Sequence, residues 1–144
     1  MDEPRRLGPD DAAALAALFD DYDWWASRTE ADVRRALDGT DLAMGIDRDG
    51  ELVAAARVLT DFTFIATIYD VIVATDHRRE GLGTALLEAV LAHEELAEVR
   101  YVSITCRRGL RAFYASAGFR EVGPTVDSPD GPQELIRMTV DRTD

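Results

Sequence analysis

The sequence predicts a mixed α/β fold in which helices pack against a sheet. Apolar residues recur at helical spacing near the N-terminus, an Asp-Gly pair separates two strand-like segments, and strand-like and helical segments then alternate. The chain has 144 residues, of which 47% are hydrophobic and 31% charged, as is typical of globular proteins. This length suits one hydrophobic core, so we expect a single domain over residues 1–144.

Two helices are expected in the first forty residues. Apolar residues at helical spacing predict the first over 12–19, and Asp10 or Asp11 would cap it. A Thr-Glu-Ala-Asp capping signal at 29–32 begins the second helix, which Gly39 should end.

Strands and further helices are expected after residue 40. The Asp49-Gly50 pair favours a tight hairpin turn between strand-like segments over 42–46 and 52–59, and 64–73 is the most β-prone stretch. The remaining expected elements are a helix over 84–96, a strand over 100–105, a helix over 111–117 closed by Gly118, and strands over 119–122 and 135–140 joined by a loop over 124–132.

Composition and charge exclude several classes of function. The formal net charge is −12 and all 16 basic residues are arginine, so we expect no nucleic-acid partner and no lysine chemistry. No apolar run approaches the roughly 20 residues of a membrane helix, so no membrane partner is expected. A lone cysteine and an N-terminus without a secretory pattern indicate a cytoplasmic protein.

The segment Arg78–Thr84 carries the strongest chemical signal. A strand ends at Val73, a polar link follows, and two glycines flank one residue where a helix begins. Backbone N–H groups of such a turn point into one concavity, and the helix dipole makes it suit a diphosphate. A Cβ at Gly81 or Gly83 would hold phosphates away from these amides.

The same glycines allow two other interpretations. A dinucleotide-binding turn should have Gly or Ala where Leu86 stands, and the link after Val73 is long for it. The glycines could also serve only a flexible turn at the start of a helix. Spacing within this turn alone leaves these alternatives open.

Two motifs together resemble those of the GCN5-related N-acetyltransferase (GNAT) family. The first is Arg-x-x-Gly-x-Gly from Arg78 to Gly83, and the second is Phe-Tyr-x-x-x-Gly-Phe over 113–119. The resemblance implies an acyl-CoA N-acyltransferase fold with a splayed, mostly antiparallel sheet flanked by helices. It also implies one N-acetyltransferase domain over 1–144 and acetyl-CoA as co-substrate.

The resemblance implies where acetyl-CoA would bind. Main-chain groups of Val71 and Val73 would pair with the pantetheine arm as a further strand would, and an N–H near Val71 or Ile72 would polarise the acetyl carbonyl. The diphosphate would lie on the turn, whose residues are Arg78, Arg79, Glu80, Gly81, Leu82, Gly83 and Thr84.

Two residues are the candidates for proton transfer. Tyr114 matches the family tyrosine that protonates the departing CoA thiolate, although it could simply pack the last helix with Phe113. Asp70 could take the amine proton through a water, or could instead anchor a neighbouring loop as a buried carboxylate. Glutamate is the commoner family base upstream, where this chain has Thr67 and Tyr69.

Aromatic residues in the link between the first two helices are candidates for the acceptor pocket. Tyr22, Trp24 and Trp25 could form its wall, or could belong to the core. Arg107 stands where many relatives carry Asn, and it could reach the adenosine phosphate or stay in solvent. Cys106 is expected to be a buried small hydrophobe, and no metal site is expected.

These features predict an N-acetyltransferase that passes an acetyl group directly to a primary amine in a ternary complex. A small amine or amino sugar is favoured over a protein as the acceptor. The alternative is a non-catalytic acyl-CoA sensor or interaction module with the same fold. The resemblance also allows a homodimer formed through the last strands.

Overall fold

A computed structural model of the chain describes residues 3–127 and 134–142. Within these residues, seven strands form one sheet in the order β1-β2-β3-β4-β5-β7-β6, and each neighbouring pair is antiparallel except β4 and β5. The predicted mixed α/β class is therefore confirmed. The strands are β1 (Arg5–Leu7), β2 (Leu42–Arg48), β3 (Glu51–Thr60), β4 (Ile65–Val73), β5 (Tyr101–Arg107), β6 (Arg120–Asp127) and β7 (Glu134–Asp141).

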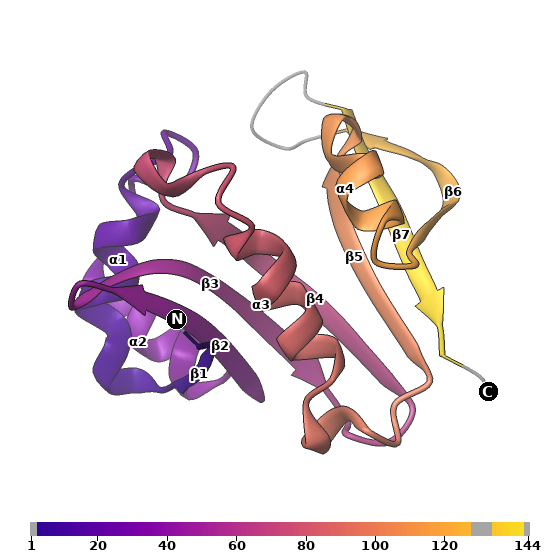
Figure 1. Ribbon diagram of the computed structural model, residues 1–144, viewed down its shortest axis with the longest axis horizontal. Coiled ribbons are helices and arrows are strands. Elements are labelled where there is room, and N and C mark those ends of the chain that lie inside the picture. Colours follow the sequence, from indigo (N-terminus) through magenta and orange to yellow (C-terminus); the bar gives the residue numbers. More distant parts are fainter. Residues whose placement is uncertain (1–2, 128–133, 143–144) are drawn as a thin grey trace.

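Helices pack against both faces of the sheet. The cluster beneath α3 (Leu82–Leu91) and α4 (Arg111–Ala115) includes Leu86, Val90 and Ile104. A second cluster joins α1 (Ala12–Phe19) and α2 (Glu30–Asp38) to the opposite face of β2, β3 and β4. Figure 1 shows α3 crossing in front of β4. None of the described helices combines the length and the apolarity that crossing a membrane requires.

The sheet is splayed between β4 and β5. The two strands pair in parallel only through Ile65–Ile68 and Tyr101–Ile104. Beyond these residues β4 continues along β3, and β5 continues along β7. The strands therefore diverge toward their C-terminal ends, as Figure 1 shows.

Several local sequence signals are confirmed. Asp49 and Gly50 adopt φ values of 53° and 83°, as a tight hairpin turn requires. The Thr29 hydroxyl accepts a hydrogen bond of 3.1 Å from the Asp32 N–H and so caps α2, and Gly39 follows its last turn. Gly118, with φ of 98°, lies just after α4.

Other predictions about the elements are wrong. Asp11 makes no side-chain bond to cap α1, because its carboxylate accepts a hydrogen bond from the Gly8 N–H instead. The helix expected over 84–96 begins at Leu82 and ends at Leu91, and the His93 side chain then caps a separate 3₁₀ turn. The expected helix over 111–117 ends at Ala115.

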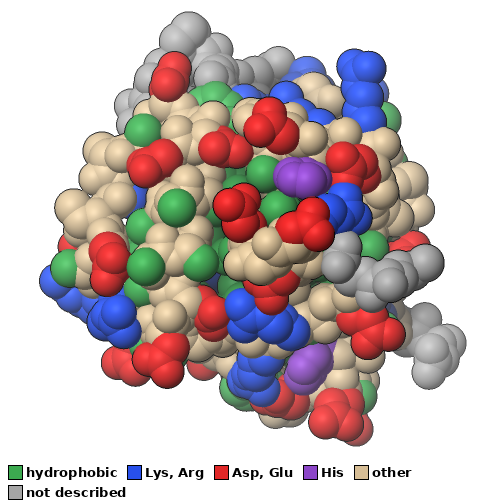
Figure 2. Space-filling model, turned by 60° about the vertical axis from the view of Figure 1, so that its left-hand side comes forward, with side chains coloured by type: hydrophobic (Ala, Val, Ile, Leu, Met, Phe, Trp, Pro, Cys, Tyr) green, Lys and Arg blue, Asp and Glu red, His purple; other side chains and the backbone are tan. Residues whose placement is uncertain are grey.

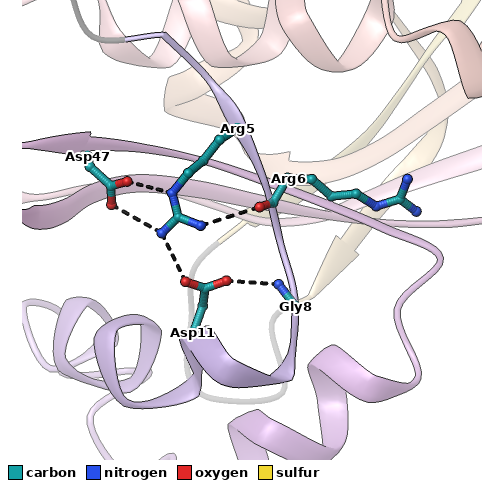
Figure 3. A network of polar contacts seen from close by, with 5 residues as sticks. All are labelled: Arg5, Arg6, Gly8, Asp11 and Asp47. Carbon is teal, nitrogen blue, oxygen red and sulfur yellow. Dashed lines mark hydrogen bonds and ion pairs between the residues drawn. The ribbon is translucent and has the colours of Figure 1, made fainter.

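Two further differences concern strands. The loop expected over 124–132 is shorter, because β6 continues to Asp127; residues 128–133 lie outside the described part. The strand β1 was not predicted. It pairs with β2 through the backbone, and Figure 3 shows the side-chain contacts that accompany this pairing: Arg5 bonds to Asp47 near the end of β2 and to Asp11. The bond from Arg5 lowers the pKa of Asp11, so this contribution to stability is lost as the pH falls through that pKa.

The packing around Gly45 in β2 gives a test of this fold. A Cβ there would lie 2.8 Å from Leu52 Cδ1, 3.0 Å from Leu7 Cδ1 and 3.0 Å from the Ala54 carbonyl oxygen. Because the backbone oxygen cannot move aside, we expect Gly45→Ala to lower the free energy of unfolding by about 1–3 kcal/mol in urea titrations. Gly8→Ala is the control, since a Cβ at Gly8 meets nothing within 4 Å; equal stability of the two variants would contradict the packing of β1 on β2.

Candidate active site

A groove of about 960 Å³ lies where β4 and β5 separate. Its walls come from β4, β5, the turn before α3, the start of α3, α4 and the link between α1 and α2. The structure brings together every predicted site residue except Glu80, whose carboxylate bonds instead to Arg48. The predicted residues that line the groove are Tyr22, Trp24, Trp25, Asp70, Val71, Ile72, Val73, Arg78, Arg79, Gly81, Leu82, Gly83, Thr84 and Tyr114.

The turn before α3 departs from regular backbone geometry at two residues. Arg79 and Gly81 are left-handed, with φ values of 66° and 79°, and α3 begins directly after Gly81. In the described part of the chain, no side-chain hydrogen bond caps this helix, so its first N–H groups are available to a ligand. The predicted concavity of amides is therefore sterically feasible in this turn.

Different physical constraints require glycine at the two positions of the turn. A Cβ at Gly81 would meet nothing within 4 Å, so the left-handed backbone is what requires glycine there. A Cβ at Gly83 would lie 3.3 Å from Phe113 Cζ and 3.6 Å from Val73 Cγ2. Gly83 thus lets α3 approach α4 and β4 closely, a reason that spacing in the sequence did not indicate.

Tyr22 connects the α1–α2 link to the groove. Its hydroxyl donates a hydrogen bond of 2.6 Å to the Val73 carbonyl and accepts bonds of 3.0 and 2.8 Å from Arg78. Tyr22 is buried in the second cluster, as the core interpretation expects, and also lines the groove; its contact with an acceptor stays a prediction. Trp25 packs 5.4 Å from Phe19, between ring centroids, and Trp24 is 40% exposed.

The free edge of β4 faces the groove at Val73. The Ala74 N–H donates a 2.8 Å bond to the Val53 carbonyl on the β3 side, so strand alternation directs the polar groups of Val73 toward the groove. One lone pair of the Val73 carbonyl oxygen is engaged by Tyr22, and the second is available to a ligand.

Asp70 forms the centre of an ion-pair cluster. Arg57 Nε and Arg28 Nη1 each lie 2.8 Å from Asp70 Oδ2, and Arg28 Nη2 lies 3.3 Å from Oδ1. The Asp70 side chain is only 10% exposed, and the residue is left-handed, with φ of 55°, at an irregularity in the β3–β4 register. These contacts favour the anchoring interpretation of Asp70, and no local signal in the sequence pointed to Arg28 or Arg57.

Tyr114 and Cys106 lie together on the groove wall. Burial, with a smaller contribution from Cys106, raises the pKa of Tyr114, which is 3% exposed. Burial and the charge of Glu121 raise the pKa of Cys106 to about 11. Both groups are therefore protonated at neutral pH. The raised pKa makes Tyr114 a weaker acid than a free tyrosine, and Cys106 is the buried, unreactive thiol that was expected.

Arg107, at the end of β5, lines the groove and faces the link between α1 and α2. Its guanidinium carbon lies 3.5 Å from the centroid of the Trp24 ring, so the two side chains bridge from the end of β5 to the α1–α2 link. This stacking was not among the positions considered for Arg107 from the sequence. Thr105, Leu110 and Tyr69 also line the groove; none of them was predicted to bind a ligand, and Tyr69 was noted only as a position where the family base is absent.

The family model and the related sequences that match this chain point to the same family. Residues 20–131 match the model of the acetyltransferase (GNAT) domain. An uncharacterized N-acetyltransferase, ycf52, of Pyropia yezoensis is 27% identical over 116 residues, which are 78% of this chain. The chain spans only 63% of the length of that relative.

Solved structures agree on the fold. The ribosomal-protein-S18-alanine N-acetyltransferase of Escherichia coli superposes with a TM-score of 0.83 at 22% identity, over 100% of this chain and 96% of that one. The diaminobutyrate acetyltransferase EctA of Paenibacillus lautus was solved with L-2,4-diaminobutyric acid and coenzyme A. It superposes with a TM-score of 0.79 at 18% identity, over 100% of this chain and 97% of that one. The domain model matches most of the chain, and the sheet has the splayed form that the family resemblance implied. This protein therefore belongs to the GNAT acetyltransferase family.

Proposed function

We propose that the chain is an acetyl-CoA-dependent N-acetyltransferase that moves the acetyl group directly to a primary amine. The observation that carries the proposal is the meeting of the groove between β4 and β5 with the left-handed turn at the start of α3. An extended molecule with an anionic end fits this arrangement, because its arm would lie along the free edge of β4 and its phosphates on the amides of the turn.

The residues of the chain fit the binding of acetyl-CoA in three places. N–H groups from Arg79 to Thr84 would hold the diphosphate, and Arg78 and Arg79 would add positive charge. The edge of β4 at Val71 and Val73 would pair with the pantetheine arm. The register irregularity at Asp70 would turn a main-chain N–H near Val71 or Ile72 toward the acetyl carbonyl oxygen.

The proposed reaction forms one N–C bond and breaks one C–S bond. The amine nitrogen attacks the acetyl carbon, the departing sulfur takes a proton from the Tyr114 hydroxyl, and the amine proton passes to water. The Tyr114 oxygen then takes a proton back from solvent, so the enzyme is unchanged at the end of the cycle. The protonated, buried thiol of Cys106 supports direct transfer without an acyl-enzyme. Tyr22, Trp24 and Trp25 would border the acceptor, for which a small amine or amino sugar remains the favoured class.

A second candidate function is a non-catalytic acyl-CoA sensor. Asp70 is the one carboxylate among the described residues that line the groove, and both its oxygens are engaged by arginine, which supports this alternative. Acetyl-CoA binding without release of CoA thiol in the presence of amines would support the sensor. A cytoplasmic location, a single domain over 1–144 and a homodimer remain predictions.

The turn can be tested by calorimetry with acetyl-CoA. We expect Gly81→Ala to bind roughly 5- to 30-fold more weakly, because a left-handed non-glycine residue costs about 1–2 kcal/mol that binding must overcome. Gly109→Ala is the matched control, since Gly109 also lines the groove and a Cβ there meets nothing within 4 Å. Equal affinities for both variants and the wild type would remove the basis for the diphosphate site.

The role of Tyr114 can be tested by steady-state kinetics. Tyr114→Phe removes the hydroxyl but keeps the ring contacts with Phe113 and Phe119, so we expect kcat to fall about 10²- to 10⁴-fold with little change in the KM for acetyl-CoA. Cys106→Ala should retain turnover. A Tyr114→Phe variant with wild-type kcat would show that another group protonates the thiolate.

The two interpretations of Asp70 predict different mutant series. If Asp70 anchors the left-handed residue, activity should rank Asp70→Asn at or above Asp70→Gly, and both above Asp70→Ala, because Asn and Gly tolerate φ near 55°. If Asp70 is the base, all three variants should lose activity to a similar degree. We expect the first order, measured as kcat across a pH series.

A further inference from the structure

Arg107 projects from the face of β5 that lies away from α3. Val102, Ile104 and Cys106 belong to the core cluster beneath α3, so strand alternation places Arg107 on the opposite face. The turn that would hold the diphosphate packs on the α3 side, where Leu82 belongs to the same cluster. Arg107 therefore lies on the α1–α2 side of the sheet, against Trp24, a residue proposed to border the acceptor.

The charge of Arg107 is not neutralised in the part of the chain that the structure describes. Its contact there is with the face of Trp24, which orients the guanidinium without pairing its charge. A planar guanidinium in this setting has its N–H groups available for a carboxylate or a phosphate, which it can bind through two parallel hydrogen bonds.

A second excess positive charge surrounds Asp70, which lines the groove, although its two arginine partners are not among the described lining residues. Asp70 is bonded to two arginines, Arg28 and Arg57, so this cluster carries a formal charge of +1. The diphosphate site would account for Arg78 and Arg79, but not for Arg107 or for the excess charge around Asp70.

This local charge contrasts with the rest of the molecule. The formal net charge is −12, and acidic side chains are spread over the face in Figure 2. Such a field favours cationic ligands, so arginines at the acceptor side oppose the trend of the whole surface. They are explained if the acceptor itself bears a negative group.

On the basis of the proposed acetyltransferase activity, we propose that the acceptor carries an anionic group, a carboxylate or a phosphate, near its reactive amine, and that Arg107 binds this group. Trp24 holds the guanidinium in place. Arg107 thus determines which amines are accepted, while the proton transfers remain with other residues.

Matched pairs of acceptors test the inference. One pair is β-alanine and β-alaninamide, and the other is glucosamine 6-phosphate and glucosamine; CoA-thiol release gives kcat/KM for each. We expect the wild type to prefer the anionic member of at least one pair about tenfold or more, and Arg107→Gln to bring this ratio close to one. The pair that shows the effect distinguishes carboxylate from phosphate.

Arg100→Gln is the matched control, because Arg100 directly precedes the opposite end of the same strand and pairs with Asp141. It removes the same charge and should keep the wild-type ratio. No preference in the wild type, or the same ratio in both variants, would overturn the inference. If none of these four amines releases CoA thiol, calorimetry of the same pairs on the CoA-bound protein decides the inference separately from the proposed activity. Selective binding of an anionic member that Arg107→Gln abolishes supports the inference. Equal binding of both members overturns it.

Discussion

The short parallel pairing of β4 with β5 is the constraint on which the rest of the site depends. Four residue pairs join the strands, and beyond Ile68 and Ile104 each strand keeps only its other neighbour. Backbone groups along a strand edge are strong hydrogen-bonding groups, so an edge that faces a groove is suited to receive an extended ligand. The groove, the free edge of β4 and the exposed start of α3 all follow from this one separation.

Side chains from distant segments keep the separation in a defined shape. Tyr22 ties the α1–α2 link to the end of β4 and to the phosphate turn, and Asp70 ties the same strand to Arg28 and Arg57. Trp24 and Arg107 meet across the mouth. The link between the two N-terminal helices therefore shapes the groove together with the motif residues.

Much of the fold was predictable because its signals are local. The Asp49-Gly50 turn, the Thr29 cap and the glycine before α3 each act through neighbouring residues, and the structure has all three. Predictions failed where a distant partner decides the outcome. Asp11 bonds to the Gly8 N–H and to Arg5 rather than capping α1, and β1 exists because β2 offers it an edge.

The site divides in the same way. The turn and Tyr114 were found from motif spacing, whereas the Arg28–Asp70–Arg57 cluster joins residues 13 to 42 positions apart and leaves no local pattern. The packing constraint that requires glycine at position 83 could not be predicted either, because it depends on Phe113 from a different helix.

Because β4 and β5 are joined at one end only, the two parts of the sheet share few backbone bonds. A small rotation about that junction changes the width of the groove most at its far end. A molecule that bonds to both strands would link the two parts into a single cooperative unit, so occupancy would raise the resistance of the whole chain to heat and proteolysis by more than local protection of the groove.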